Sequence, residues 1–202
     1  MKQALILVDL QNDFFPGGAL AVPQGDAILP VLKKIFETMP FDKVIATKDW
    51  HPKDHGSFAS NHGKKTGEVV LLEGIRQILW PIHCVENTQG AEFAPGFDTQ
   101  RIHKTFYKGT DPFIDSYSAF FDNGHKKSTG LGEYLAEEGI RKITIMGLAT
   151  DYCVRYSVID ALSLGLDVTV IANGCRAVDL RPGDGKRALS EMKEAGAKIL
   201  TI

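Results

Sequence analysis

The sequence predicts an α/β protein in three layers, with a six-stranded, mainly parallel sheet covered by helices on both faces. Short runs rich in Val, Ile and Leu alternate along the chain with amphipathic stretches of helical length. These runs also lack a strict alternation of polar and apolar residues. Strands that are apolar on both faces and separated by helices are typical of parallel sheets built from right-handed crossovers.

The individual elements follow from this alternation. Apolar runs predict six strands, at residues 4–8, 43–47, 102–107, 142–147, 167–172 and 197–202. Amphipathic stretches between them predict four helices, at residues 26–39, 129–138, 150–164 and 184–195. Residues 48–100 interrupt the pattern, because they are rich in Gly, Pro, Asn and His and contain only brief apolar pieces such as Val69 to Leu72. A loop of that length inside a compact domain is usually functional.

Length and composition limit the number of domains and the kinds of partner that can be expected. With 202 residues and 44% hydrophobic content, the chain is expected to form a single domain over residues 1–202. The formal net charge is −2 and no Lys/Arg run occurs, so neither nucleic acid nor an anionic membrane is expected as a partner. A small molecule is the expected partner, and nothing in the sequence decides whether the protein forms a homo-oligomer.

Two features favour a soluble protein of the cytoplasm. The first residues, MKQALILVDLQNDF, are apolar over too short a stretch for a signal peptide or a membrane span. The three cysteines are few and odd in number, which argues against a disulfide framework and for reduced thiols.

Reactive side chains follow four of the predicted strands. Asp9 follows the first apolar run, Asp49 the second and Lys108 the third, while Cys153 comes shortly after the fourth, at the start of a helix. Parallel α/β sheets bind ligands at the carboxyl ends of their strands. Each residue alone has a structural explanation, as a packed thiol, a turn cap or an exposed lysine. Those explanations do not account for their meeting at one edge.

The three residues Asp9, Lys108 and Cys153 predict a nucleophile with its base. A helix N-terminus and a neighbouring ammonium both favour the thiolate form of Cys153. Asp9 would accept the thiol proton and later deliver it to a leaving amine. The backbone N–H groups of Ala149 and Cys153 could bind the developing oxyanion. The expected chemistry is acyl transfer through a thioester.

A second group predicts a metal site. Asp49 and His51 are separated by one residue, so in extended chain their side chains point the same way. His83 is the candidate third ligand, and His55 is a candidate fourth. Oxygen and nitrogen ligands of this kind suit one divalent ion, most often zinc, with iron or manganese as alternatives.

The remaining cysteines and histidines receive structural interpretations. Cys84 is expected to face away from its neighbour His83 and to pack as an apolar residue, and Cys175 is interpreted in the same way. Three histidines without a partner pattern are assigned to the surface: His62, His103 and His125.

Motifs spread over almost the whole chain resemble those of nicotinamidases in the isochorismatase-like hydrolase superfamily, which has a Rossmann-like fold. Together these motifs are far more specific than any one of them. They are VDLQNDF (8–14), KDWHP (48–52), HGSFA (55–59), WPIHC (80–84), FYKG (106–109), SYSAFFDN (116–123) and GLATDYCV (147–154).

The resemblance implies a role for each matching position. It implies a catalytic triad of Asp9, Lys108 and Cys153, and a cis peptide bond between Leu148 and Ala149. The implied metal ligands are Asp49, His51 and His83, and family members differ over a fourth, which leaves His55 open. The implied substrate contacts are Phe14, Trp80, Tyr117, Leu148 and Ala149.

The implied reaction converts nicotinamide and water to nicotinate and ammonia, a step of NAD salvage. Pyrazinamide would be a second substrate, because it keeps the carboxamide and a ring nitrogen. In the family the ring nitrogen approaches the metal, so the ion orients the substrate.

Other functions fit the same residues less well. Isochorismatases lack the nucleophilic cysteine, which here would be Cys153. N-carbamoylsarcosine and ureidoacrylate hydrolases lack the full metal set. A metallohydrolase with a metal-bound water would leave Cys153 a structural role. A small-molecule sensor on the same scaffold would gain nothing from the triad.

Overall fold

A six-stranded sheet forms the centre of the molecule in the computed structural model, which describes all 202 residues. Its strand order is β5-β2-β1-β6-β7-β8, and every pairing is parallel, as the sequence predicted. The strands are β1 (Gln3–Val8), β2 (Lys43–Asp49), β5 (Lys104–Lys108), β6 (Lys142–Leu148), β7 (Asp167–Arg176) and β8 (Lys198–Leu200).

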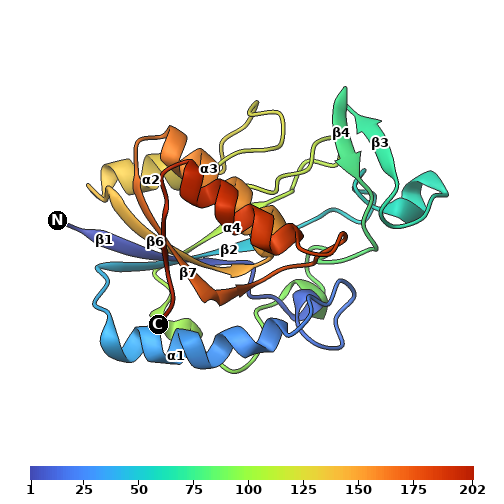
Figure 1. Ribbon diagram of the computed structural model, residues 1–202. Helices are drawn as coiled ribbons and strands as arrows, with labels where there is room; N and C mark the ends of the chain where they lie inside the picture. The colour runs from blue at the N-terminus through green and yellow to red at the C-terminus, as the bar shows by residue number, and fades with distance from the viewer.

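Helices cover both faces of this sheet, which confirms the three layers (Figure 1). One face carries α1 (Leu29–Thr38) and the other carries the remaining three helices. These are α2 (Leu131–Glu137), α3 (Arg155–Ser163) and α4 (Asp184–Glu194).

Local sequence explains these elements. The last five residues of β1, ALILV, are all buried, as expected for a central strand with helices on both faces. In α1, Leu32 and Ile35 are buried, and a proline lies in the first turn, where the missing N–H costs no hydrogen bond. Forty buried hydrophobic residues from Ala4 to Ala197 form one core cluster, so both ends of the chain contribute to the same core.

Several helices and strands begin or end a few residues from their predicted limits, and three further details differ from the prediction. β7 continues to Arg176, which places Cys175 inside the strand, after an irregularity in the pairing of β6 with β7. Cys153 lies in a π-helical turn, Thr150–Val154, that precedes α3. The irregular segment 48–100 contains an antiparallel hairpin of β3 (Val69–Leu72) and β4 (Ile75–Ile78).

The strand order reverses at the centre of the sheet. From β1 the chain adds β2 and β5 on one side, then returns to add β6, β7 and β8 on the other. In open parallel sheets a ligand crevice forms at such a point, beyond the carboxyl ends of the strands. The segment containing the hairpin lies beyond this carboxyl edge (Figure 1).

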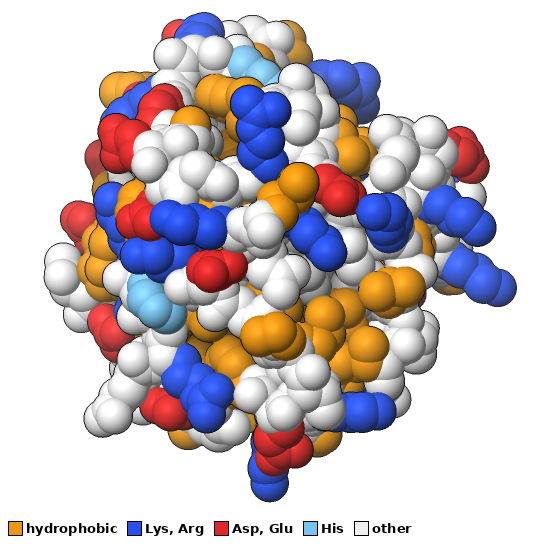
Figure 2. Space-filling view, turned by 90° about the vertical axis from the view of Figure 1, so that its left-hand side faces the viewer, with side chains coloured by type: hydrophobic (Ala, Val, Ile, Leu, Met, Phe, Trp, Pro, Cys, Tyr) orange, Lys and Arg blue, Asp and Glu red, His pale blue; other side chains and the backbone are white.

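The opposite face, at the amino ends of the strands, has a mixed surface. Positive and negative side chains are interspersed around an apolar area (Figure 2). None of the helices has the length and apolar character needed to span a bilayer.

Candidate active site

Four neighbouring strands deliver Asp9, Asp49, Lys108 and Cys153 to one edge of the sheet. Asp49 and Lys108 are paired in register at the ends of β2 and β5. Asp9 directly follows β1 and has a left-handed backbone conformation, with φ of 52°. Cys153 follows β6. All four side chains are buried.

The Lys108 ammonium lies at the centre of this group. Its Nζ is 2.8 Å from Asp9 Oδ2 and 3.3 Å from Cys153 Sγ, and it also forms an ion pair with Asp49. Asp9 Oδ1 accepts a 2.6 Å hydrogen bond from the hydroxyl of Thr47. Lys108 therefore contacts both other members of the predicted trio, and ligand atoms of Asp9 and Cys153 lie within 4.8 Å of each other.

The pKa of the Cys153 thiol shifts in the direction opposite to the one that its sequence position suggested. Burial raises the pKa of the thiol well above its usual value, and the carboxylates of Asp9 and Asp49 raise it further. Lys108 lowers the pKa but does not compensate. The helix N-terminus and Lys108 were expected to favour the thiolate form, but desolvation and the two carboxylates act in the opposite direction and keep the proton on the sulfur until Asp9 accepts it.

The carboxylates differ from each other. Burial raises the pKa of Asp9, and Lys108 only partly offsets this. Burial also acts to raise the pKa of Asp49, but Lys108 and His51 outweigh it and hold that pKa well below its usual range. Asp9 is thus the carboxylate better suited to take up a proton.

The turn after β6 offers a hydrogen-bond donor beside the thiol. The Leu148–Ala149 peptide bond is cis, as the resemblance implied. The backbone N–H of Ala149 has no acceptor among the protein groups. Asp151, in the π-helical turn that follows, accepts hydrogen bonds from the N–H groups of Val178 and Asp179, at 3.0 and 2.8 Å, and so links the turn to the segment after β7.

The predicted metal ligands also converge. His51 Nε2 and His83 Nε2 lie 3.6 and 3.7 Å from the same Asp49 oxygen, Oδ2. The Nδ1 atoms of the two histidines bind the carbonyls of Gly109 and Pro81, each at 2.8 Å, which turns both Nε2 atoms toward Asp49. This carbonyl–histidine arrangement is typical of metal sites. The donor set therefore fits a divalent ion.

His55 lies beside this group without joining it. Its ring is 4.3 Å from that of His51, but the atoms that it brings within ligand distance belong to a second set, with His51 and Asp115. Its Nδ1 contacts the Ser57 hydroxyl at 2.7 Å, and its buried Nε2 has no partner. Burial and the neighbouring His51 lower the pKa of His55 to about 4, so its ring is neutral.

A small cavity of about 30 Å³ opens between the thiol and the metal group. Four of the five predicted substrate contacts line it. The fifth, Leu148, does not: it is fully buried and lies beside Gly25. The four that line the cavity are Phe14, Trp80, Tyr117 and Ala149.

Comparison with known proteins identifies the family. The profile of the isochorismatase domain matches residues 3–202. The chain belongs to the isochorismatase family.

Several similar proteins of the isochorismatase family are nicotinamidases or pyrazinamidases. A nicotinamidase of Escherichia coli (strain K12) is 48% identical over 202 residues, covering 99% of this chain and 95% of that protein. The structure of an Acinetobacter baumanii nicotinamidase and pyrazinamidase has a TM-score of 0.94 and 40% identity, covering 99% and 96% of the two chains. A Pyrococcus horikoshii pyrazinamidase solved in complex with zinc has a TM-score of 0.78 and 36% identity, with both chains fully covered.

Sequence reasoning missed several residues of this isochorismatase-family site. Leu20, Asp115, Tyr152 and Val178 also line the cavity. Tyr152 could have been found from its position beside Cys153, and Val178 from its position just after β7. Leu20 lies in a loop with no such signal.

The structural interpretations of the remaining cysteines and histidines agree with the structure, but the reason given for Cys84 was wrong. Cys84 and Cys175 are buried and unpaired, and the three remaining histidines are exposed. Cys84 has a left-handed backbone, with φ of 45°, so it is not part of an extended chain. Its N–H donates a 2.7 Å hydrogen bond to Asp13, which fixes the loop carrying His83.

Replacing Gly109 by Ala is expected to reduce metal affinity by at least about tenfold, the usual effect of disturbing the groups that orient a ligand. Gly109 has φ of 64°, and a Cβ there would overlap the His51 ring. Gly63→Ala is the matched control, because Gly63 has φ of 61° and open space around its Cβ position. Metal content after dialysis is the measurement. Equal metal retention in both variants would contradict the assigned role of His51.

Proposed function

We propose that this chain is a single-domain nicotinamidase that hydrolyses nicotinamide to nicotinate and ammonia, with pyrazinamide as a second substrate. The contact of Lys108 with both Asp9 and Cys153, beside a cavity lined by aromatic rings, is the observation that carries the proposal. The 48% identity to a nicotinamidase over nearly the whole chain supports the choice of substrate. In this role the enzyme would act in NAD salvage, in the cytoplasm.

Acylation begins with the protonated thiol. Asp9 takes the proton from Cys153 Sγ as the sulfur attacks the carboxamide carbon, and Lys108 stabilises the two negative groups between which the proton moves. The oxyanion accepts hydrogen bonds from the N–H groups of Ala149 and Cys153. When the tetrahedral intermediate collapses, Asp9 donates its proton to the leaving nitrogen. Ammonia departs, and a thioester on Cys153 remains.

Hydrolysis reverses these roles. A water molecule gives a proton to Asp9 as its oxygen attacks the thioester carbon. The intermediate collapses with cleavage of the carbon–sulfur bond, and the proton on Asp9 returns to the sulfur of Cys153. The product leaves as nicotinic acid and passes its carboxyl proton to ammonia or to solvent, which gives nicotinate, and the resting thiol is restored.

We propose that Asp49, His51 and His83 hold one divalent metal ion, with zinc as the first candidate because of the zinc-bound Pyrococcus horikoshii relative. When bound, the ion would supply an electrophilic anchor for the pyridine nitrogen. Phe14 and Trp80 would then hold the ring in the cavity, which leaves the carboxamide beside Cys153. Leu148 would support the wall from behind.

Incubation of the metal-loaded protein with nicotinamide, with isochorismate as a parallel substrate, tests the proposal. Ammonia release from nicotinamide without cleavage of isochorismate is the expected result. Cleavage of isochorismate alone would contradict the proposal and indicate an isochorismatase. Binding of nicotinamide without turnover would indicate a small-molecule sensor.

Replacing Thr47 by Val is expected to move the acid limb of the kcat/KM profile to higher pH and to lower kcat/KM near pH 7 about tenfold, as for loss of one hydrogen bond to a charged group. The Thr47 hydroxyl lowers the pKa of Asp9, so its removal raises that pKa and protonates the base at a higher pH. Thr47→Ser should restore the profile, since it keeps the hydroxyl. An unchanged acid limb in Thr47→Val would contradict Asp9 as the base.

A further inference from the structure

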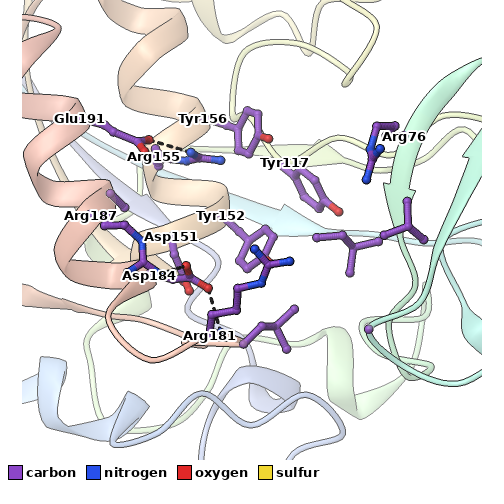
Figure 3. Close-up of a pocket in the computed structure, with 15 residues that line it drawn as sticks. Arg76, Tyr117, Asp151, Tyr152, Arg155, Tyr156, Arg181, Asp184, Arg187 and Glu191 are labelled. Atoms are coloured by element: carbon purple, nitrogen blue, oxygen red, sulfur yellow. Dashed lines mark hydrogen bonds and ion pairs between the residues drawn. The ribbon is translucent and has the colours of Figure 1, made fainter.

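A larger cleft lies next to the active-site cavity and has no part in the reaction described above. It has a volume of about 570 Å³ and is bounded by the β3–β4 hairpin, α3, α4 and the loop before α4 (Figure 3). Tyr117 and Tyr152 line both this cleft and the active-site cavity. The cleft is therefore the neighbour of the substrate site.

Four arginines line the cleft, and two of them already have partners. Arg155 forms a 2.7 Å ion pair with Glu191. Arg187 forms an ion pair with Asp184. Both pairs lie along the α3 and α4 wall of the cleft (Figure 3).

The other two arginines, Arg76 and Arg181, have side chains with neither an ion-pair nor a hydrogen-bond partner. Arg76 comes from β4 and Arg181 from the loop before α4, so they approach the cleft from opposite sides (Figure 3). The third carboxylate of the cleft, Asp151, is occupied by the N–H groups of Val178 and Asp179. Asp151 forms no ion pair with either arginine, and four arginines against three carboxylates leave the lining of the cleft with an excess of positive charge.

Aromatic rings form the floor between these charges. The Tyr117 ring lies 5.5 Å from that of Tyr152 and 5.2 Å from that of Tyr156. The Arg155 guanidinium stacks on Tyr156, with 4.7 Å between its central carbon and the ring centroid. Faces of tyrosine and arginine are the surfaces on which planar bases stack, and guanidinium groups bind phosphate through paired hydrogen bonds.

We propose that this cleft binds a free nucleotide, with its phosphates between Arg76 and Arg181 and its base on Tyr152 and Tyr156. The volume falls within the range usual for small-molecule sites. Because Tyr117 and Tyr152 are shared with the active-site cavity, a bound nucleotide hinders entry of the neutral amide substrate. The cleft would then link turnover to the supply of nucleotides.

Calorimetric titration of the metal-loaded protein with ADP tests the site directly and does not depend on turnover. Adenosine lacks the phosphates and pyrophosphate lacks the base, so both are expected to bind more weakly than ADP. Arg76→Ala and Arg181→Ala should each weaken ADP binding about tenfold, and the double variant about a hundredfold, as expected for loss of one guanidinium–phosphate contact each. Arg141→Ala, a variant of an exposed arginine away from the cleft, should bind as the wild type.

Absence of ADP binding at millimolar concentration, or binding that the double variant retains, would overturn the nucleotide site. Pyrophosphate binding as tightly as ADP would overturn the role of the tyrosines. Steady-state assays add a second check, because ADP should raise the KM for the amide in the wild type and not in the double variant. An unchanged KM with saturating ADP would overturn the hindrance of substrate entry. If no amide is turned over at all, the proposed function fails while the titration still decides the site.

Discussion

Replacing Cys153 by Ala is expected to lower the rate of ammonia release from nicotinamide by about 10⁴-fold or more. Losses of this size are usual when an enzyme loses its nucleophilic side chain. The thiol lies 3.3 Å from Lys108 Nζ in a buried group with Asp9, so no other side chain can take its place at the carboxamide. The loss should appear in kcat. Metal content and nicotinamide binding should persist, because the ligand group Asp49, His51 and His83 does not include the thiol.

Cys175→Ala provides the matched control. Cys175 is equally buried and unpaired, but it lies within β7 and does not line the cavity. Its replacement should leave the rate of ammonia release near that of the wild type. Acid quenching of the wild type during turnover should trap a nicotinoyl adduct on Cys153, detectable by mass spectrometry. Substantial activity in Cys153→Ala would instead favour attack by a metal-bound water.

Replacing His83 by Ala is expected to remove most of the bound metal and to raise the KM for nicotinamide by about a hundredfold, in line with the loss of one coordinating ligand or its support. Its Nε2 lies 3.7 Å from Asp49 Oδ2, and its Nδ1 is held by the Pro81 carbonyl. The larger effect should fall on KM, because the proposed role of the ion is to anchor the pyridine ring.

His103→Asn is the control for this second experiment. His103 is exposed and immediately precedes β5, at the end opposite to the carboxyl edge. Metal analysis and steady-state kinetics on both variants, with chelated wild type alongside, separate metal loss from unfolding. If His83→Ala keeps its metal and its KM, the metal site must be built from other residues, and the set His51, His55 and Asp115 becomes the candidate.

The sequence alone determined the layers of the molecule and the positions of its reactive groups along the chain. Apolar runs without polar alternation, such as ALILV in β1, can be stable only when buried on both faces, so the parallel sheet was predictable. Residues at the carboxyl ends of parallel strands meet at one edge of the sheet. The sequence alone therefore predicted that Asp9, Asp49 and Lys108 lie in one site.

Only the tertiary structure decided which state these groups adopt. The pKa of Cys153 depends on its burial and on carboxylates that follow or end two other strands, and no local sequence pattern contains these long-range contributions. The approach of His83 to Asp49, and the position of Arg76 in the cleft that Arg181 also lines, depend on how the segment 48–100 folds back over the sheet edge. Local sequence sets the conformation of each strand and helix, but long-range packing sets solvent exposure and the distances between charges.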